Sequence, residues 1–111
     1  MKTHLKAGRW SGHYQQGGHD FPQAMTLEFA DGVMRGGGSD GVGRFVVEGA
    51  YRTDGPVVRV GWIKTYHGAH SILYLGEYDG YEIVGHWSWG SHRGRQPFAL
   101  HYVGREAGAL P

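Results

Sequence analysis

The chain has 111 residues, the size of a single domain with one core. Its 21 glycines show no three-residue period and 14% of its residues are aromatic, which excludes collagen and disorder. The 11 basic and 10 acidic residues are interspersed, so nothing indicates nucleic acid or a membrane surface as a partner.

The absence of cysteine excludes disulfides, thiolate chemistry and cysteine-type zinc sites. Residues 1–10 lack the apolar core of a signal peptide, and no stretch approaches the roughly 20 apolar residues of a membrane span. We therefore expect a cytoplasmic protein, unless a signal peptide has been removed.

Short segments of alternating apolar and polar residues follow one another along the chain, and a period of two predicts half-buried strands. In chain order they cover residues 8–16, 24–30, 33–38, 44–52, 56–66, 71–78, 81–89 and 96–103. Between neighbouring strands, Asp31-Gly32, Asp54-Gly55 and Asp79-Gly80 tolerate the positive φ of a tight hairpin turn. Pro22 argues against a strand through residues 17–22.

The glycine-rich residues 36–43 raise the question of a phosphate-binding loop. Such a loop needs a helix after it, whose first amides face the anion. The residues that follow, 44–52, alternate like a strand. We therefore expect a glycine-rich turn that carries the chain across one end of a barrel.

Eight short strands without helical periodicity predict an all-β fold, a single antiparallel up-and-down β-barrel spanning residues 1–111. We expect its core to run from about residue 9 to residue 103, with loose termini. The side chains predicted to fill the lumen are Trp10, Leu27, Phe29, Phe45, Tyr51, Val60, Trp62, Tyr74, Trp87 and Phe98. Inward glycines would relieve crowding where strands bend, at Gly12, Gly49, Gly76 and Gly85.

The central stretch carries a recognisable series of short motifs. They are Gly61-Trp62, Ala69-His70-Ser71, Gly76-Glu77-Tyr78 and Trp87, with Gly8-Arg9-Trp10 at the start. In these motifs the chain resembles the avidin and streptavidin group of calycin-type ligand-binding barrels. The resemblance implies a lumen site for a small molecule to which Ser71 contributes. Leu73 and Leu75 stand where that group continues its polar ligand contacts, and the polar cluster of its first two strands has no match, so biotin is not the expected ligand.

Two patterns disagree about the orientation of residues 71–78. Alternation places Ile72 and Tyr74 in the lumen, whereas the resemblance implies that Ser71 and Leu73 face inward. A slip of one residue exchanges the two sets completely. We prefer the assignment by alternation.

Lys64 is a charged residue on an otherwise apolar strand face, between Trp62 and Tyr66. A buried ammonium must find an anion or lose its proton, because an isolated buried charge is very costly. One interpretation is a site for a small anionic or aromatic ligand, with Lys64 binding a carboxylate or phosphate. Its contacts would be Trp62, Lys64, Tyr66, Tyr74, Trp87, Tyr51 and Ser71. Alternatively, Lys64 pairs internally with Asp40 or Glu48, or reaches out of the barrel mouth.

No motif indicates catalysis, a metal or a cofactor, so we expect none of the three. A serine elbow and the histidine spacing of zinc enzymes are both missing. The strand histidines are expected on the outer surface, at His13, His86 and His101. An enzyme would instead need a polar cluster at a barrel mouth, for which His67, His70 and Asp40 are the candidates.

The outer wall of the predicted barrel carries a run of apolar residues on neighbouring strands. These are Val46, Val57, Ile63, Leu73, Leu75 and Val84. A contiguous apolar patch indicates an interface, and packing of two copies through it would form a symmetric oligomer. The sequence thus supports two hypotheses, a non-enzymatic small-ligand-binding barrel and a packed barrel that acts as an assembly or protein-interaction module.

Overall fold

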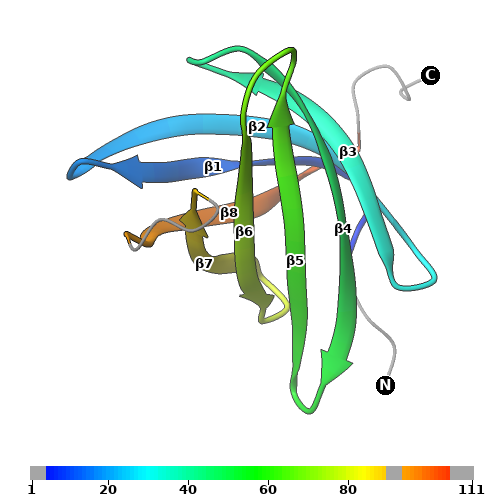
Figure 1. The fold of residues 1–111 in the computed structure, drawn as a ribbon. Helices are drawn as coiled ribbons and strands as arrows, with labels where there is room; N and C mark the ends of the chain where they lie inside the picture. The colour runs from blue at the N-terminus through cyan, green and yellow to red at the C-terminus, as the bar shows by residue number, and fades with distance from the viewer. Residues whose placement is uncertain (1–4, 90–93, 106–111) are drawn as a thin grey trace.

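The computed structural model describes residues 5–89 and 94–105, and its regular elements are eight β-strands (Figure 1). They are β1 (Gly8–Gln16), β2 (His19–Ala30), β3 (Val33–Asp40), β4 (Arg44–Asp54), β5 (Val57–Tyr66), β6 (Ser71–Tyr78), β7 (Glu82–Ser88) and β8 (Gln96–Gly104). Each strand pairs antiparallel with the next, and β8 pairs with β1, so the sheet closes. The predicted all-β, eight-stranded up-and-down barrel is therefore confirmed. Within the described ranges, no helix is long and apolar enough to cross a membrane.

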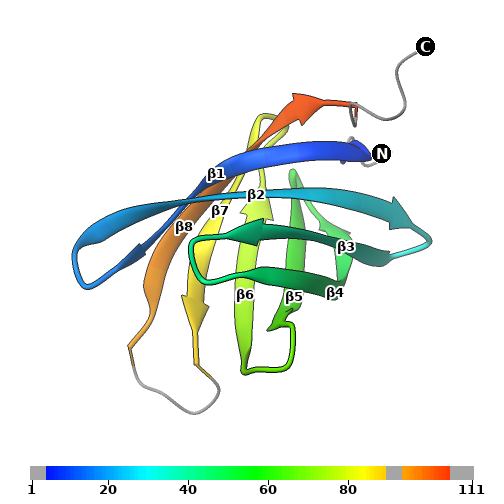
Figure 2. The same ribbon diagram turned by 90° about the horizontal axis from the view of Figure 1, so that it is seen from above.

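The sheet twists strongly as it closes. In Figure 1, β1 and β2 run roughly horizontally while β4, β5 and β6 run roughly vertically. Figure 2 shows β1 beside β8, where the two ends of the sheet meet. Closure leaves no long unpaired edge, the feature that makes open sheets prone to aggregate.

The alternation of the sequence assigns the lumen correctly. All ten predicted lumen residues face inward; eight are buried, while Phe29 and Tyr51 are half-buried and pack against the core. On β6, Ile72 and Tyr74 are buried and Leu75 is exposed. The assignment by alternation is therefore confirmed, and the inward orientation of Ser71 and Leu73 implied by the resemblance is wrong.

The first correction concerns Pro22, which lies inside β2 rather than in a loop. Pro22 pairs with His13 of β1, but the pairing of β2 with β3 begins only at Gln23. Residues 19–22 therefore form a two-stranded extension with one unpaired edge. A missing N–H is tolerated at such an edge.

The second correction concerns the glycine-rich segment, which is mostly strand. β3 runs through Gly36 and Gly38 to Asp40, and only residues 41–43 form the turn. A Cβ at Gly36 would overlap the carbonyl oxygen of Thr26, and one at Gly38 would overlap that of Ala24. These glycines thus let β3 approach β2 closely, whereas the sequence pattern had predicted a glycine-rich turn.

The hairpin turns follow the expected chemistry with one shift. Asp31 and Gly32 have φ values of 53° and 81°, as a primed two-residue turn requires. In the next hairpin β4 continues through Asp54, and the turn consists of Gly55, at φ 67°, and Pro56. Glycine has a positive φ in both turns, and Asp31 also has one in the first.

One end of the lumen is closed by five aromatic rings, here called the aromatic plug: Trp10, Phe29, Tyr51, Tyr78 and Tyr102. Trp10 contacts Phe29, Tyr78 and Tyr102 edge to face, with centroids 6.2, 5.8 and 5.5 Å away. Its indole Nε1 donates to the Lys6 carbonyl at 2.9 Å. The chain before β1 thus seals this end, and the other end differs in character.

Candidate functional site

Lys64 lies on the inner face of β5, and its side chain is completely buried. Its ammonium donates to Asp40 Oδ2 at 2.6 Å, to Gln23 Oε1 at 3.0 Å and to Tyr74 Oη at 3.4 Å. An ammonium has three donors, so each has an acceptor. The internal pair with Asp40, one of the two predicted for Lys64, supplies the anion that a buried charge requires.

Aromatic rings surround the same ammonium. The Lys64 Nζ lies 4.3 Å from the ring centroid of Phe45, 4.9 Å from Tyr14, 5.1 Å from Tyr66 and 5.4 Å from Tyr74. A cation within about 6 Å of a ring centroid is attracted by the ring quadrupole. The rings therefore partly replace the water that burial removes from Lys64.

Asp40 ends β3 and joins the ammonium to the neighbouring turn. Its Oδ2 also accepts the Tyr66 hydroxyl at 2.6 Å, and its Oδ1 accepts the amides of Val42 and Gly43 at 2.9 and 3.4 Å. Burial alone would raise the pKa of Asp40, but the hydrogen bonds from Lys64, Tyr66 and Val42 and the Lys64 charge hold that pKa below its usual value. Asp40 is therefore a carboxylate at neutral pH.

Burial acts in the opposite sense on the other members of the cluster. It lowers the pKa of Lys64, and the bond to Asp40 opposes that shift. Burial, followed by the hydrogen bond and charge of Asp40, raises the pKa of Tyr66; burial, with Tyr14 and Asp40, raises that of Tyr74. Both phenols stay protonated over the physiological range, so they act as neutral hydrogen-bonding groups and not as bases.

A pocket of about 150 Å³ opens at this end of the barrel. We call it the mouth pocket; its lining residues are Tyr14, Gln16, Val42, Tyr66, His70, Ile72, Tyr74, Trp87 and Trp89. Five of the nine are tyrosine or tryptophan, and two, Tyr66 and Tyr74, also hydrogen-bond the ion pair beneath. The pocket thus has aromatic walls, and the hydrogen-bonded ion pair of Lys64 and Asp40 lies beneath them.

The rim of the mouth pocket is ordered by stacking and one hydrogen bond. The His70 imidazole lies parallel to the Trp89 ring, with centroids 4.6 Å apart and planes at 9°, and 5.2 Å from Tyr66. Trp87 Nε1 donates to the Gln15 carbonyl at 2.8 Å. The aromatic rings that line the pocket are therefore held in place by contacts with other residues of the protein.

The structure brings five of the seven predicted site residues into one region: Trp62, Lys64, Tyr66, Tyr74 and Trp87. The Trp62 ring stacks on the Tyr74 ring, with centroids 5.1 Å apart, one layer deeper in the lumen. Tyr51 does not join them, because it lies in the aromatic plug, where its ring centroid is 5.6 Å from that of Phe29. Ser71 is exposed on the outer face of β6 and bonds to Thr65 at 3.0 Å, so its predicted place in the lumen is wrong.

Among the residues that surround Lys64, Gln23 and Tyr14 were missed from the sequence, and the pocket lining adds others that were not assigned to the site: Gln16, Val42, Ile72 and Trp89. Gln23 is 2% exposed and bonds Lys64. The inward series of Met25 and Leu27 includes Gln23 if it is continued backward, but Pro22 ended the predicted strand there. Tyr14 continues the inward series of Trp10, and nothing in its pattern distinguished it from a core residue.

By hydrogen-bond geometry, two buried donors lack partners among the described residues, the Gln23 amide Nε2 and the Trp62 indole Nε1, although Gln23 lies near enough to Tyr74 to act on the pKa of that phenol. Lys64 fixes the orientation of the Gln23 amide, because Oε1 must face the ammonium. Such donors are uncommon in a folded core, and each has a stability cost. Both lie on the inner wall beside Lys64 or Tyr74.

The features considered for catalysis do not gather into one cluster. The described residues contain no group of three or more His, Asp or Glu side chains that could hold a metal ion. His70 lines the pocket, His67 is exposed, and the Asp40 carboxylate is bonded to Lys64, Tyr66 and the adjacent turn. The hydrogen bonds and charge that lower the pKa of Asp40 leave it a poor proton acceptor.

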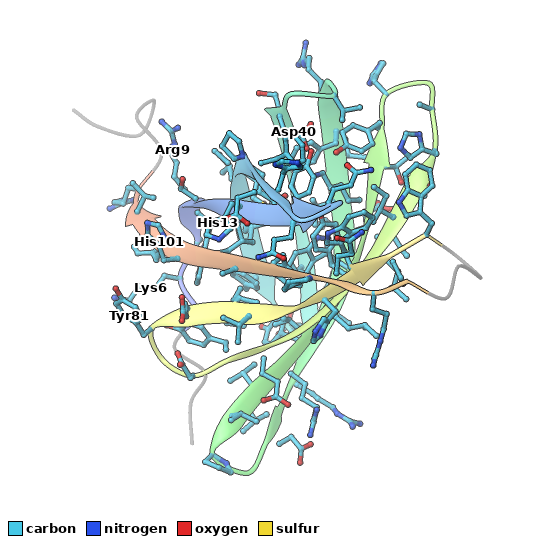
Figure 3. All side chains as sticks on the ribbon, turned by 90° about the vertical axis from the view of Figure 1, so that its left-hand side faces the viewer. Lys6, Arg9, His13, Asp40, Tyr81 and His101 are labelled. Atoms are coloured by element: carbon cyan, nitrogen blue, oxygen red, sulfur yellow. The ribbon has the colours of Figure 1, made fainter. Side chains whose placement is uncertain are left out.

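The outer wall presents the predicted apolar residues. Val46, Ile63, Leu75 and Val84 are exposed, and Val57 and Leu73 are half-buried. Beside them a groove of about 790 Å³ crosses β5 to β8, lined among others by Arg59, Leu75, Glu77, Val84, His86 and Pro97. The strand histidines are exposed as predicted; Figure 3 shows His13, His101 and Arg9 along β1 and β8.

No protein-family model matches the chain, and no curated protein or solved structure matches it significantly. The resemblance to the avidin group therefore stays a prediction, and the site is interpreted from its own geometry.

Proposed function

We propose that this protein is a non-enzymatic binding protein that holds one small, planar, uncharged ring system in the mouth pocket. The observation that carries the proposal is a pocket walled by tyrosine and tryptophan above an ion pair that is already neutralised. Aromatic walls favour flat ligands, because offset-stacked and edge-to-face contacts add to the burial of apolar area.

The ion pair argues for an uncharged ligand. Lys64 already has three acceptors, so a ligand carboxylate or phosphate would find no free cation at the base of the pocket. A ligand cation would approach the Lys64 ammonium and lose its own hydration. Of the small anionic or aromatic ligands predicted from the sequence, the aromatic class is the one that we propose.

The volume argues for a ligand no larger than two small fused rings. Pockets for drug-sized ligands measure roughly 300–1,000 Å³, whereas an apolar cavity of about 150 Å³ accepts benzene. The mouth pocket, at about 150 Å³, has the smaller size. We expect phenol and indole to fit and larger fused systems to be excluded.

A titration followed by amide NMR and tryptophan fluorescence tests the proposal, with phenol, indole, benzoate and benzylamine as probes. We expect phenol or indole to shift the amide signals of Val42, His70 and Ile72, with benzoate and benzylamine at least roughly tenfold weaker. Neutral rings that shift only residues outside the mouth pocket, or shift none, would overturn the proposal.

Two variants on one strand provide a matched control. Ile72 lines the mouth pocket, so Ile72→Trp should fill it and abolish probe binding. Leu75 is exposed on the outer face of β6, so Leu75→Trp adds the same ring outside and should leave affinity unchanged. Equal affinities of the two variants would contradict the pocket as the site.

A second candidate function, assembly through the outer wall, is favoured by the exposed apolar residues on β4 to β7. We propose that two copies pack face to face over Ile63 and Leu75, as a symmetric dimer would require. Sedimentation at micromolar concentration should then show a dimer that Ile63→Glu with Leu75→Glu dissociates. Val103→Glu, at an exposed apolar residue of β8, is the control. A monomer in the unsubstituted protein would exclude this function.

A further inference from the structure

We propose that Asp40 is the positioning residue of the mouth pocket, because its carboxylate bonds two of the pocket walls directly and holds the β3–β4 turn, which packing does not hold. The consequence for a ligand rests on the proposed function, whereas the positioning itself can be measured without one. The inference assigns the buried ion pair to shaping the pocket rather than to stabilising the barrel.

The Asp40 carboxylate joins parts of the pocket that are far apart in the chain. Oδ2 accepts the Tyr66 hydroxyl of β5, and Oδ1 accepts the Val42 amide of the β3–β4 turn; both residues line the pocket. Through Lys64 the same carboxylate reaches Tyr74, a third lining residue, on β6. One side chain therefore fixes walls contributed by three segments.

The β3–β4 turn has little else to hold it. Val42 is 59% exposed, and a Cβ built at Gly41 or Gly43 would meet no atom within 4 Å. Besides the two amide bonds to Oδ1, a backbone bond from the Asp40 amide to the Gly43 carbonyl, at 3.0 Å, closes the turn. The position of Val42 at the pocket rim therefore depends on Asp40.

The fold itself gives no reason for a charge at Lys64. Its neighbours in register, Val47 of β4 and Ile72 of β6, are both apolar and buried. Burying two charges costs hydration that their attraction repays only in part, so a well-packed apolar pair of similar volume often does as well or better. Apolar side chains cannot, however, make directed bonds to the Val42 amide and the Tyr66 hydroxyl. Those bonds are what the ion pair adds.

The decisive variant replaces both charges, as Asp40→Leu with Lys64→Met. We expect its denaturation midpoint to stay close to that of the unsubstituted protein, because neither charge is left alone, although Tyr66 and Gln23 each lose a hydrogen bond. We also expect hydrogen exchange at the Val42 and Gly43 amides to accelerate by roughly tenfold or more, the loss of about one hydrogen bond. Indole affinity should fall by roughly tenfold or more, as a displaced wall would cause.

Two controls separate this effect from a general loosening. Asp54→Asn removes an exposed carboxylate that bonds Arg59, and it should leave the Val42 and Gly43 amides as protected as before. In the unsubstituted protein these amides should exchange more slowly than the Gly18 amide, which belongs to a turn where a Cβ also meets open space. This comparison decides the question even if the double variant does not fold.

The outcomes are distinct. Unchanged exchange at Val42 and Gly43 in the double variant, or exchange in the unsubstituted protein as fast as at Gly18, would overturn the positioning role. A collapse of the denaturation midpoint with these two amides still protected would make the pair a stabilising element instead. If the unsubstituted protein binds none of the probes, the proposed function is lost, and the exchange rates still decide the role of Asp40.

Discussion

The two ends of the barrel are built from the same alternating strands, but one is closed by aromatic rings and the other is open above a buried ion pair. At one end, Trp10 and the rings around it close the lumen with the help of the chain before β1. At the other end, Lys64 and Asp40 form a buried ion pair beneath an open pocket. Figure 3 shows Asp40 well separated from Lys6, which marks the sealed end.

The ends also differ in how completely their polar groups are bonded. In the aromatic plug the Trp10 indole donates to the Lys6 carbonyl and the Tyr102 hydroxyl donates to the Ala7 carbonyl. Near the mouth, the Gln23 amide keeps a buried donor without a partner in the described part of the chain. A polar group left unbonded in a core has a stability cost, so the bonding of the plug donors is the more complete of the two.

The substitution with the largest expected effect on stability removes Trp10, the ring at the centre of the plug. Trp10→Ala should lower the free energy of unfolding by about 3–5 kcal/mol, because it deletes a fully buried ring and leaves a cavity. Urea unfolding measures this loss. Tyr81→Ala, at a highly exposed turn residue, should stay within about 0.5 kcal/mol of the unsubstituted protein. Similar losses from both substitutions would contradict the plug as a stabilising element.

The next test breaks the ion pair on one side only. Lys64→Met should lower the free energy of unfolding by about 3 kcal/mol at neutral pH, because Asp40 is left buried without its cation. The deficit should shrink as the pH falls, since burial favours the protonated acid once Lys64 is gone. Urea unfolding at neutral and at mildly acidic pH measures both effects. A deficit that does not change with pH would show that lost packing, and not an unpaired carboxylate, is the cause.

In the unsubstituted protein, acid should loosen the mouth before the plug. The pKa of Asp40 is lower in the folded state than its unfolded value of 3.8, so the stabilisation by the pair is complete above 3.8 and is lost as the pH falls through the folded pKa. Lys64 would then be a buried cation without a carboxylate. The ring signals of Tyr66 should therefore change in acid before those of Tyr102, whose hydroxyl donates to a backbone carbonyl. Simultaneous changes would mean that the ends unfold together.

Exposed carboxylates titrate over the same range and require a local measurement. Hydrogen bonding to Arg59 lowers the pKa of Asp54, and backbone hydrogen bonds lower that of Asp79, although both side chains are exposed. A global unfolding curve would add their contributions to that of Asp40. NMR signals of Tyr66 and Tyr102 report each end separately.

The same comparison explains how far the sequence could be interpreted. The inward orientation of Trp10, Phe29 and Tyr51 was predicted from alternation, but their gathering at one end was not, and Tyr51 had been assigned to the ligand site. The outward histidines followed from the same rule. For a barrel this regular, a period of two determines which side chains share the lumen.

The mouth was predicted only in part, because its function depends on partners across strands. Lys64 was recognised as anomalous, but alternation does not say that Asp40, 24 residues earlier, points at it rather than Glu48. Gln23 was lost when Pro22 ended the predicted strand, since proline is compatible with an edge that only the closed sheet reveals. Register across strands, which decides these contacts, is not written in the pattern of any single strand.

The smallest expected effect compares three tryptophans placed along the barrel. Trp10 in the plug and Trp87 at the mouth each donate an indole hydrogen bond to a carbonyl, whereas the buried indole of Trp62 between them has no partner in the described residues. Substitution by phenylalanine removes the same atoms at each position. We therefore expect Trp10→Phe and Trp87→Phe to cost about 1 kcal/mol more than Trp62→Phe in urea unfolding, which is the net contribution of one hydrogen bond.

This series separates hydrogen bonding from packing at the two ends. If Trp87→Phe costs no more than Trp62→Phe while Trp10→Phe does, the mouth bond contributes little to stability and serves to orient the ring that faces the pocket. If all three cost the same, the indole bonds at both ends contribute nothing measurable, and the contrast between the ends rests on Lys64 and Asp40 alone.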